Sequence, residues 1–527
     1  ALEFNTTGAS NTAVGTSSLD ANTTGSNNTA VGLNALGANT TASDSTAVGR
    51  DALKVNLAAS ATAVGKDALA ANTTGANAVA VGYGALKLNT TGNQNTAVGH
   101  SALDANTEGY NNTALGYASS GANVTTGHNN TSVGAYTLMA NTTGRWITAI
   151  GVASMQTAES GDGATGVGYQ SLNVHTGDYN TALGYRAMAL TTTGANNVAV
   201  GKNALEANTT GTRNLGIGVN AYKASDTESD NLAIGYDAMA TDTAGGQYNV
   251  AIGNYALDAL GAGDNNTAIG YQAGSAATSA SENTFVGYNS GLLCVDGLRN
   301  TFVGSTCGDA LTSGTDNAGV GIGSLTSLVD GQYNTAMGRS SGQETTTGDR
   351  NTYVGNDAGS GITTGSHNVM LGNQTGATGS PGGAFSGSTS NKLVIGANEI
   401  DGAHVQVDWT VASDKRDKTD VEAVKMGLDF VNKLEPVTYQ WDKRTKYVDN
   451  DDLINNKIDL NTVVHDGTHK EDWRDVGFLA QDVEKLEEEY GHKMSDKTNL
   501  TTYMSEDGAY GLTYAKFVPI LTKAIQE

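Results

Sequence analysis

The strongest constraint on the fold is a short motif, a variant of Asn-Thr-Ala-Val-Gly, that recurs 22 times and ends on glycines from Gly15 to Gly372. Successive glycines of the motif are almost always 17 residues apart. A fixed short period indicates one small structural unit stacked many times, in which each unit contacts its neighbours along the chain. We therefore predict a mostly β fold in which residues 1–376 form a β-solenoid shaft of 22 coils.

Each position of the motif suggests a place in the coil. The residue before the repeat glycine is Val, Leu, Ile or Met in every copy, as at Val14 and Met337, and we predict that it points inward and fills the core. Each copy closes with a sequence such as Asn22-Thr23-Thr24-Gly25, whose Asn and Gly tolerate the positive φ angles of sharp turns. This pattern favours two short strands and two turns per coil.

Two positions of the motif change together in the later copies. The residue two before the glycine is usually Ala, but in four late copies it is large, and the usual Leu four after the glycine is then Gly. These pairs are Phe285 with Gly291, Phe302 with Gly308, Tyr353 with Gly359 and Met370 with Gly376. Because protein interiors are densely packed, we infer that the two positions share one packing volume. The exchange is imperfect, since Gly274 and Gly342 accompany Ala268 and Ala336.

A single coil is too small to fold alone. Burial of a large side chain contributes about 1.5–3 kcal/mol, whereas ordering costs roughly 1.5 kcal/mol for each residue. Stability must come from stacking and from association, and a column of small Ala residues would let a second or third chain approach closely. We therefore predict a closely packed or intertwined homotrimer.

Composition is typical of an extracellular or virion fibre, with 69 Gly, 3 Pro and a net charge of −24. An acidic shaft of this kind does not favour nucleic acid as a partner. No apolar run approaches the ~18 residues of a membrane span, so we expect no membrane insertion, and no signal peptide is visible. The chain begins at Ala1 without Met, which leaves room for a preceding attachment segment.

Several short patterns have structural interpretations. Cys294 and Cys307 lie 13 positions apart rather than one repeat apart, which favours free packed thiols over a disulfide. The Asn-x-Thr sequences are explained as turns rather than glycosylation sites. Gly161-Asp162-Gly163 resembles a calcium-binding loop but does not recur in every coil, and the residues 465–472, with two His and two Asp, lack the spacing of a metal site. We predict no metal and no cofactor.

The period fails after Gly372, and charge density rises from Ser413 onward. We therefore divide the chain into the repeat shaft at 1–376, a Gly/Ser-rich neck with short β segments at 377–412, and a terminal domain at 413–527. Hydrophobic spacing and turn residues predict further elements. These are strands at 391–396, 404–409 and 437–441, helices at 419–434, 479–490 and 514–527, and a long loop or hairpin at 443–470.

Ordered blocks in this last segment carry a family resemblance. They are Ser413-Asp414-Lys415-Arg416-Asp417-Lys418, Gly427-Leu428-Asp429-Phe430, Leu434-Glu435-Pro436-Val437-Thr438-Tyr439, Gly477-Phe478-Leu479-Ala480-Gln481-Asp482-Val483, and Tyr514 with Ala524-Ile525-Gln526-Glu527. The segment resembles the intramolecular chaperone auto-processing domains that end phage tail spikes and fibres, including endosialidases. The resemblance implies that residues 413–527 bring three chains into register and then detach themselves.

Position by position, the resemblance implies Ser413 as nucleophile, Lys418 as general base and Ala412–Ser413 as the cleaved bond. At most, then, the chain is a self-cleaving serine endopeptidase, with no activity expected on external substrates. A lysine can activate a serine hydroxyl if its environment keeps it neutral, and a spacing of five brings the two together only on a bent segment. Asp417 stands where the family usually has an aliphatic residue, and its carboxylate favours charged Lys418. Taken alone, Ser413-Asp414 also reads as a helix cap.

These features predict a phage tail-fibre or tail-spike protein located in the virion tail, which binds a glycan or protein receptor on the host surface. The alternative is a cellular trimeric adhesin or extracellular filament, because the Ala-Val-Gly-x-x-Ala-Leu pattern is also similar to head repeats of trimeric autotransporter adhesins. Receptor contacts are predicted in the loops 224–230 and 376–387 and at Trp146. A glycan-cleaving spike is disfavoured, since no paired carboxylates recur along the shaft.

Overall fold

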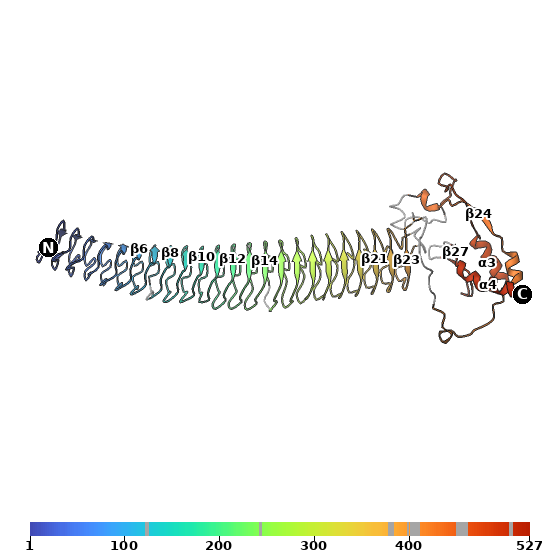
Figure 1. The fold of residues 1–527 in the computed structure, drawn as a ribbon, viewed down its shortest axis with the longest axis horizontal. Helices are drawn as coiled ribbons and strands as arrows, with labels where there is room; N and C mark the ends of the chain where they lie inside the picture. The colour runs from blue at the N-terminus through green and yellow to red at the C-terminus, as the bar shows by residue number, and fades with distance from the viewer. Residues whose placement is uncertain are drawn as a thin grey trace. The chain divides into compact units, whose positions relative to one another are not determined.

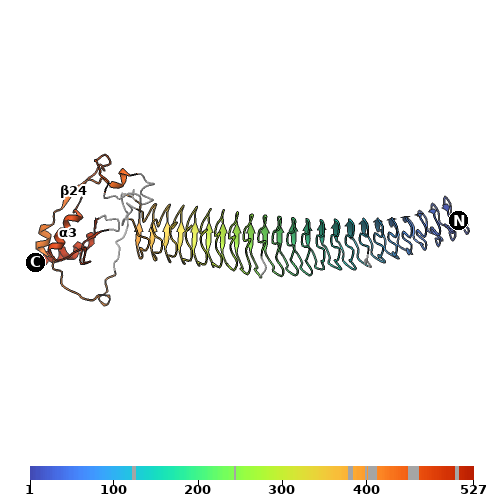
Figure 2. The same cartoon turned by 180° about the vertical axis from the view of Figure 1, so that it is seen from behind.

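The structure is a computed structural model that describes residues 1–121, 126–241, 245–377, 384–397, 400, 412–448, 462–504 and 510–527. It divides into two compact units, Ala1–Asn300 and Thr301–Glu527, and each is described by itself. Within each unit the repeat strands follow one another in chain order (Figures 1 and 2).

Each copy of the motif forms one three-residue strand that ends immediately before the repeat glycine. In the first unit the strands are β1 (Thr12–Val14), β2 (Thr29–Val31), β3 (Thr46–Val48), β4 (Thr62–Val64), β5 (Val79–Val81), β6 (Thr96–Val98), β7 (Thr113–Leu115), β8 (Thr131–Val133), β9 (Thr148–Ile150), β10 (Thr165–Val167), β11 (Thr181–Leu183), β12 (Val198–Val200), β13 (Leu215–Ile217), β14 (Leu232–Ile234), β15 (Val250–Ile252), β16 (Thr267–Ile269) and β17 (Thr284–Val286). In the second unit they are β18 (Thr301–Val303), β19 (Ala318–Val320), β20 (Thr335–Met337), β21 (Thr352–Val354) and β22 (Val369–Leu371), and one further strand, β23 (Leu393–Ile395), pairs with β22 beyond the last copy. The strand expected at 391–396 is thus present as β23.

Neighbouring strands pair in parallel and in constant register, so that equivalent residues form columns. Thr12 is the partner of Thr29, and Val14 is the partner of Val31. The register survives changes in coil length, because Thr46 pairs with Thr62 and Thr113 pairs with Thr131. Residues gained or lost are therefore absorbed in the turns. The prediction of a mostly β solenoid is confirmed.

The prediction of two strands per coil is wrong. Apart from isolated bridge residues at Ser281, Leu298 and Thr315, the segment that returns to the next strand is a series of turns in the described coils. Its backbone still bonds from coil to coil, as in the amide of Leu36 to the carbonyl of Ala52 at 3.1 Å. However, Leu36 and Leu53 have φ of 50° and 49°, and this left-handed conformation is incompatible with an extended strand.

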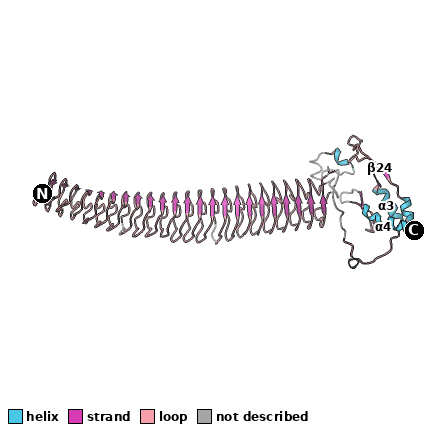
Figure 3. Cartoon of the chain, viewed as in Figure 1, coloured by secondary structure: helices cyan, strands magenta, loops and turns pink. Residues whose placement is uncertain are grey.

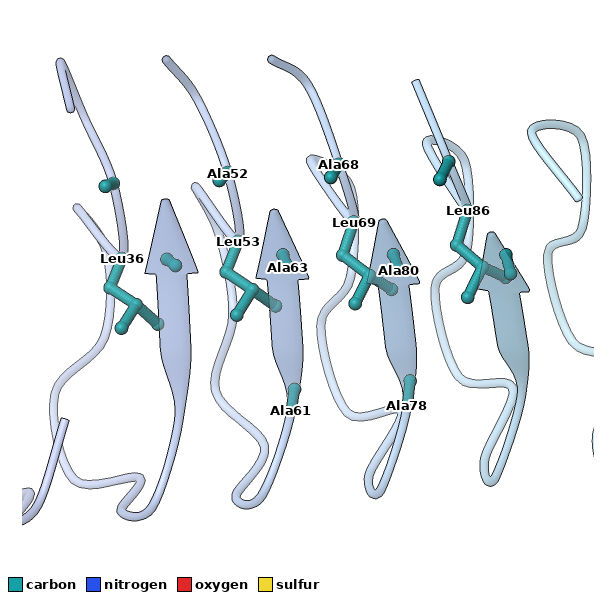
Figure 4. Close-up of a cluster of buried hydrophobic side chains, with 14 of the residues drawn as sticks. Leu36, Ala52, Leu53, Ala61, Ala63, Ala68, Leu69, Ala78, Ala80 and Leu86 are labelled. Carbon is teal, nitrogen blue, oxygen red and sulfur yellow. The ribbon is translucent and has the colours of Figure 1, made fainter. Parts of the chain in front are cut away.

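The inward-facing residue also differs from the prediction. The central Ala of the strand is fully buried, as at Ala47, whereas Val14 and Val48 are exposed. Because successive side chains of a strand point to opposite sides, burial of the Ala places both flanking residues outside. The core consists of this Ala column together with the Leu column of the return segment. Figure 4 shows Leu53 and Leu69 pointing toward the strands.

The repeat glycine is required by its conformation and by the next coil. Gly49 has a φ of +135°, and a Cβ added there would lie 2.4 Å from the carbonyl oxygen of Gly65. Any side chain would therefore separate the stacked coils.

The structure confirms that the large late residues share volume with the missing Leu. A Cβ on Gly291 would lie 2.5 Å from the ring of Phe285, and one on Gly274, in the preceding coil, would lie 2.8 Å from the same ring. Tyr353 stands in the same relation to Gly359 and Gly342. One aromatic ring thus occupies the Leu space of two adjacent coils, which explains the glycines that have no aromatic residue in their own copy.

The turn after the Leu column carries buried Asn side chains in the early coils. Asn89 donates to Oδ1 of Asn72 at 2.8 Å and to the carbonyl of Gly92 at 3.0 Å. In most later coils the equivalent position is apolar, as at Leu311 and Cys294, although it is Thr345 in one of them. Cys294 and Cys307 are free and buried, as predicted, and burial raises the pKa of each thiol to about 12.

Helices occur only in the C-terminal part of the described residues (Figure 3). The elements are α1 (Leu428–Lys433), α3 (Ala480–Glu489), α4 (Phe517–Gln526), and the antiparallel pairs β24 (Val437–Tyr439) with β25 (Asp475–Gly477) and β26 (Thr502–Met504) with β27 (Tyr510–Leu512). Short 3-10 turns span Lys415–Asp417, Arg444–Tyr447 and Tyr514–Lys516. No helix of the described chain is long and apolar enough to cross a membrane.

The predicted elements of this part are mostly present, with one large correction. The helix expected at 419–434 is only α1, because Asp420 has a φ of 51° and Val421 is exposed. Helices at 479–490 and 514–527 and the strand at 437–441 are found in shorter form as α3, α4 and β24. The loop expected at 443–470 contains the turn Arg444–Tyr447, and its residues 449–461, like the strand expected at 404–409, lie outside the described residues.

Candidate functional site

The predicted dyad lies on a short bent segment. The 3-10 turn Lys415–Asp417 reverses the chain between Ser413 and Lys418, and Lys418 itself is extended. Nζ of Lys418 lies 2.6 Å from Oγ of Ser413 and 3.4 Å from the Ser413 carbonyl oxygen. The side chains of Ser413 and Lys418 therefore meet, and they do so on a bent segment, as their spacing of five residues requires.

The turn is stabilised by the neighbouring Asp414. Its carboxylate accepts the backbone amide of Arg416 at 2.9 Å and pairs with the Arg416 guanidinium. These contacts, the guanidinium first, lower the pKa of Asp414 below its ordinary value. The capping interpretation therefore holds for Asp414, while the Ser413 side chain remains directed at Lys418.

The site is open in the single chain. Ala412, Ser413 and Lys418 are all exposed, and in this geometry the amine donates to the hydroxyl. Attack by Ser413 requires the reverse arrangement, in which a neutral amine accepts the hydroxyl proton. Within the described residues, no ion pair joins Asp417 to Lys418, so its carboxylate does not hold the amine in place.

A small core supports the segments that carry the family blocks. It comprises Met426, Phe430, Val483, Leu486, Phe517 and Ile520. The hydroxyl of Tyr514 accepts the backbone amide of Phe478 at 3.2 Å, which joins two of the blocks. A Cβ on Gly477 would lie 2.4 Å from that hydroxyl, and this close approach explains the glycine.

Glu487 is a residue that sequence reasoning missed. It is fully buried in α3, and its carboxylate accepts the Thr501 amide at 2.6 Å and the hydroxyls of Thr501 and Thr502 at 2.7 and 2.5 Å. A buried carboxylate is stable only with such partners. Its position in a run of three glutamates, Glu487–Glu489, gave no sequence signal, and its role is to hold the start of β26.

The residues predicted to contact a receptor lie outside the segment that carries Ser413 and Lys418. In the loop 224–230, Glu228 turns inward and accepts the amides of Asp226 and Thr227 at 2.7 and 3.0 Å. Trp146 is exposed, and the Arg145 guanidinium lies 5.0 Å from its ring centroid. The loop 376–387 is described only in part. No group of three or more His, Cys, Asp or Glu that could hold a metal occurs among the described residues.

The fold and this segment together define a parallel β-solenoid protein with a small C-terminal α+β domain. Residues 413–492 match the family model described as chaperone of endosialidase. The resemblance seen in the sequence is confirmed for these residues, which include Ser413 and Lys418 and end shortly after α3. No curated protein and no solved structure matches the chain.

Proposed function

We propose that this protein is a structural component of a phage tail fibre or tail spike, located in the virion tail. In this proposal its solenoid projects a surface that binds a glycan or protein receptor on the host, and its C-terminal domain directs assembly of a homotrimer. The coarser assignment, a tail-fibre or spike-like protein, rests on the solenoid combined with the chaperone-of-endosialidase domain. That domain also favours this assignment over a cellular adhesin.

The domain then separates from the shaft by one self-cleavage, and the 2.6 Å contact between Lys418 and Ser413 is the observation that carries this step. Neutral Lys418 takes the Ser413 hydroxyl proton, and Oγ attacks the Ala412 carbonyl carbon. The C–N bond between Ala412 and Ser413 breaks, and the proton passes to the leaving amine of Ser413. Water hydrolyses the resulting ester, which releases Ala412 as a carboxylate and Ser413 as a free N-terminus.

Expression of the full chain followed by a denaturing gel and N-terminal sequencing tests the step. The wild type is expected to give two fragments, one of which begins at Ser413. Ser413→Ala and Lys418→Ala are expected to leave one band at 53.8 kDa. Lys415→Ala is the matched control, because Lys418 and not Lys415 is the lysine that contacts Ser413, and it should cleave normally. An uncut wild type, or cleavage that persists in Ser413→Ala, contradicts the proposal.

A further inference from the structure

Within each unit the strands leave a column of apolar side chains at least partly exposed, formed by the Val, Leu, Ile or Met before each repeat glycine. We call the residues three before, one before and one after each repeat glycine the outer strip. The first two flank the buried Ala and face away from it, and the third follows the glycine at the next alternate position. Exposed members include Leu115, Ile150, Leu183, Tyr117 and Tyr185. In the parallel register Leu115 is the partner of Val98, and Leu183 is the partner of Val200.

Charge is distributed unevenly around the coil. The chain has 53 Asp and Glu, yet none of the 22 copies has a carboxylate at any of the three outer-strip positions. The position after the glycine is instead Tyr in seven copies and Lys or Arg in four. Neighbouring rings on it are stacked, as in Tyr169 with Tyr185 at 5.4 Å between centroids. The chain has a net charge of −24, so most of its surfaces would repel those of a second copy. A surface without carboxylates avoids this repulsion between negative charges.

The size of the strip matches an interface between proteins. With about 4.8 Å between paired strands and a width of about 10 Å, β1 to β17 alone expose roughly 800 Å², the area that a stable complex buries on each partner.

The periodicity identifies the partner. A surface that repeats at every coil is matched along its whole length only by a partner with the same repeat. A second copy of this chain has that repeat, because it has the same sequence. The Ala column cannot serve this purpose, because it is buried inside its own coil. We propose that the outer strip is the lengthwise contact between copies of this chain in the assembled shaft. This inference rests on the homotrimer proposed above and names the surface that forms it.

Tyrosine nitration of the assembled full-length protein, mapped by peptide mass spectrometry, tests the contact. Tyr117 and Tyr185 lie on the strip with 49% and 47% of their surface exposed in the single chain, and Tyr179 and Tyr248 lie off it with 60% and 58%. Because an interface excludes solvent, the strip tyrosines are expected to react at least about tenfold more slowly than the other two. Sedimentation of the same sample gives the oligomeric state.

Paired variants sharpen the test. Leu115→Asp with Leu183→Asp puts two carboxylates on the strip, at side chains that are each 48% exposed, whereas Leu88→Asp with Leu190→Asp changes two leucines that are 48% and 45% exposed on the return segment. The strip variant is expected to lose the protection of Tyr117 and Tyr185, and the control variant to retain it.

The outcomes separate this inference from the proposed function. A trimer in which strip and off-strip tyrosines react equally overturns the inference but leaves the homotrimer intact. Protection that appears only when host glycan is added also overturns it, since the strip would then be a glycan site. A protein that sediments as a monomer overturns both.

Discussion

Early and late coils enclose the same three-residue strand but fill the space beneath it differently. In coils such as those of β4 and β5, a Leu from the return segment packs against Ala, as Leu69 does near Ala63 and Ala80 (Figure 4). In coils such as that of β18, the strand itself supplies Phe302 and the return segment supplies Gly308. The core volume is filled in both cases, by the return segment in the early coils and by the strand in the late coils. A solenoid core is therefore specified by the sum of neighbouring positions rather than by any single column.

The two solutions differ in how far one side chain reaches. Each early Leu belongs to one coil, whereas Phe285 and Tyr353 each fill a gap shared by two coils. The turns differ as well, since early coils stack buried Asn amides and later coils stack apolar side chains at the same position. The following predictions test these differences, beginning with the largest expected effect.

Truncation of an aromatic residue should have the largest effect. Phe302 is fully buried, and Phe302→Ala is expected to destabilise its coil by about 3–5 kcal/mol. The loss should extend to the next coil, because a Cβ on Gly319 would lie 3.0 Å from the same ring. Hydrogen exchange, which reports local opening free energies, measures both. Tyr333→Ala, at an exposed tyrosine, is the control. An effect confined to one coil would show that the Phe302 ring does not support the following strand.

An intermediate effect is expected at His175, where the turn position is neither Asn nor apolar. The ring is buried, its Nε2 has no hydrogen-bond partner, and burial lowers the pKa of His175 to about 4 from the ordinary 6.5. Since the folded state disfavours the charged ring, full stability is present above pH 6.5. Stability falls as the pH drops from 6.5 toward 4, by up to about 3 kcal/mol.

Thermal unfolding between pH 7 and pH 4 measures this loss. His175→Asn should reduce it, because the equivalent Asn56, in another 16-residue coil, donates to the Ala58 carbonyl at 2.6 Å. His367→Asn, at an exposed histidine, should leave the acid sensitivity unchanged. Equal acid sensitivity in the wild type and in His175→Asn would show that another group controls it.

The smallest effect is expected when a late coil receives the early Leu without losing its aromatic residue. Gly308→Leu places a Cβ 2.3 Å from the Phe302 ring, and overpacking of this kind costs about 1–3 kcal/mol. Combined with Phe302→Ala, however, the same substitution should be stabilising, because it restores the Ala and Leu pair. A double-mutant cycle by hydrogen exchange measures the coupling. Simple additivity of the two changes would show that the positions do not share volume.

The repeat, its parallel stacking and the coupled exchange were predictable because each rests on a pattern that recurs through the chain. Which side chain of the strand faces the core was not predictable. A three-residue strand with Ala beside Val has two apolar candidates for its buried side, and a shift of one residue exchanges them. The size of the side chains at these two positions across the copies indicates which one is buried. The residue before the glycine varies freely among Val, Leu, Ile and Met, whereas the Ala position stays small, as Ala, Ser or Gly, except in four copies, in each of which the Leu has become Gly.

In the C-terminal domain, the block containing Ser413 and Lys418 predicted which side chains meet, and the bend that joins them followed from their spacing. The helix predicted at 419–434 was too long, because some of its regularly spaced apolar residues pack against the core from a segment that is not helical. Val424 contacts the small core without being helical, and Gly427 immediately precedes α1. Buried Glu487 could not be anticipated, because its partners Thr501 and Thr502 come from a distant segment.

Coils of 16, 17 and 18 residues all deliver their strand in the same register. A gene with this property tolerates unequal recombination between its own repeats, since loss or duplication of a whole unit leaves every remaining strand with an equivalent neighbour. Crossovers that fall within a turn are tolerated too, because small insertions are accommodated there. The number of coils is thus an inheritable variable that selection can adjust without redesigning the fold.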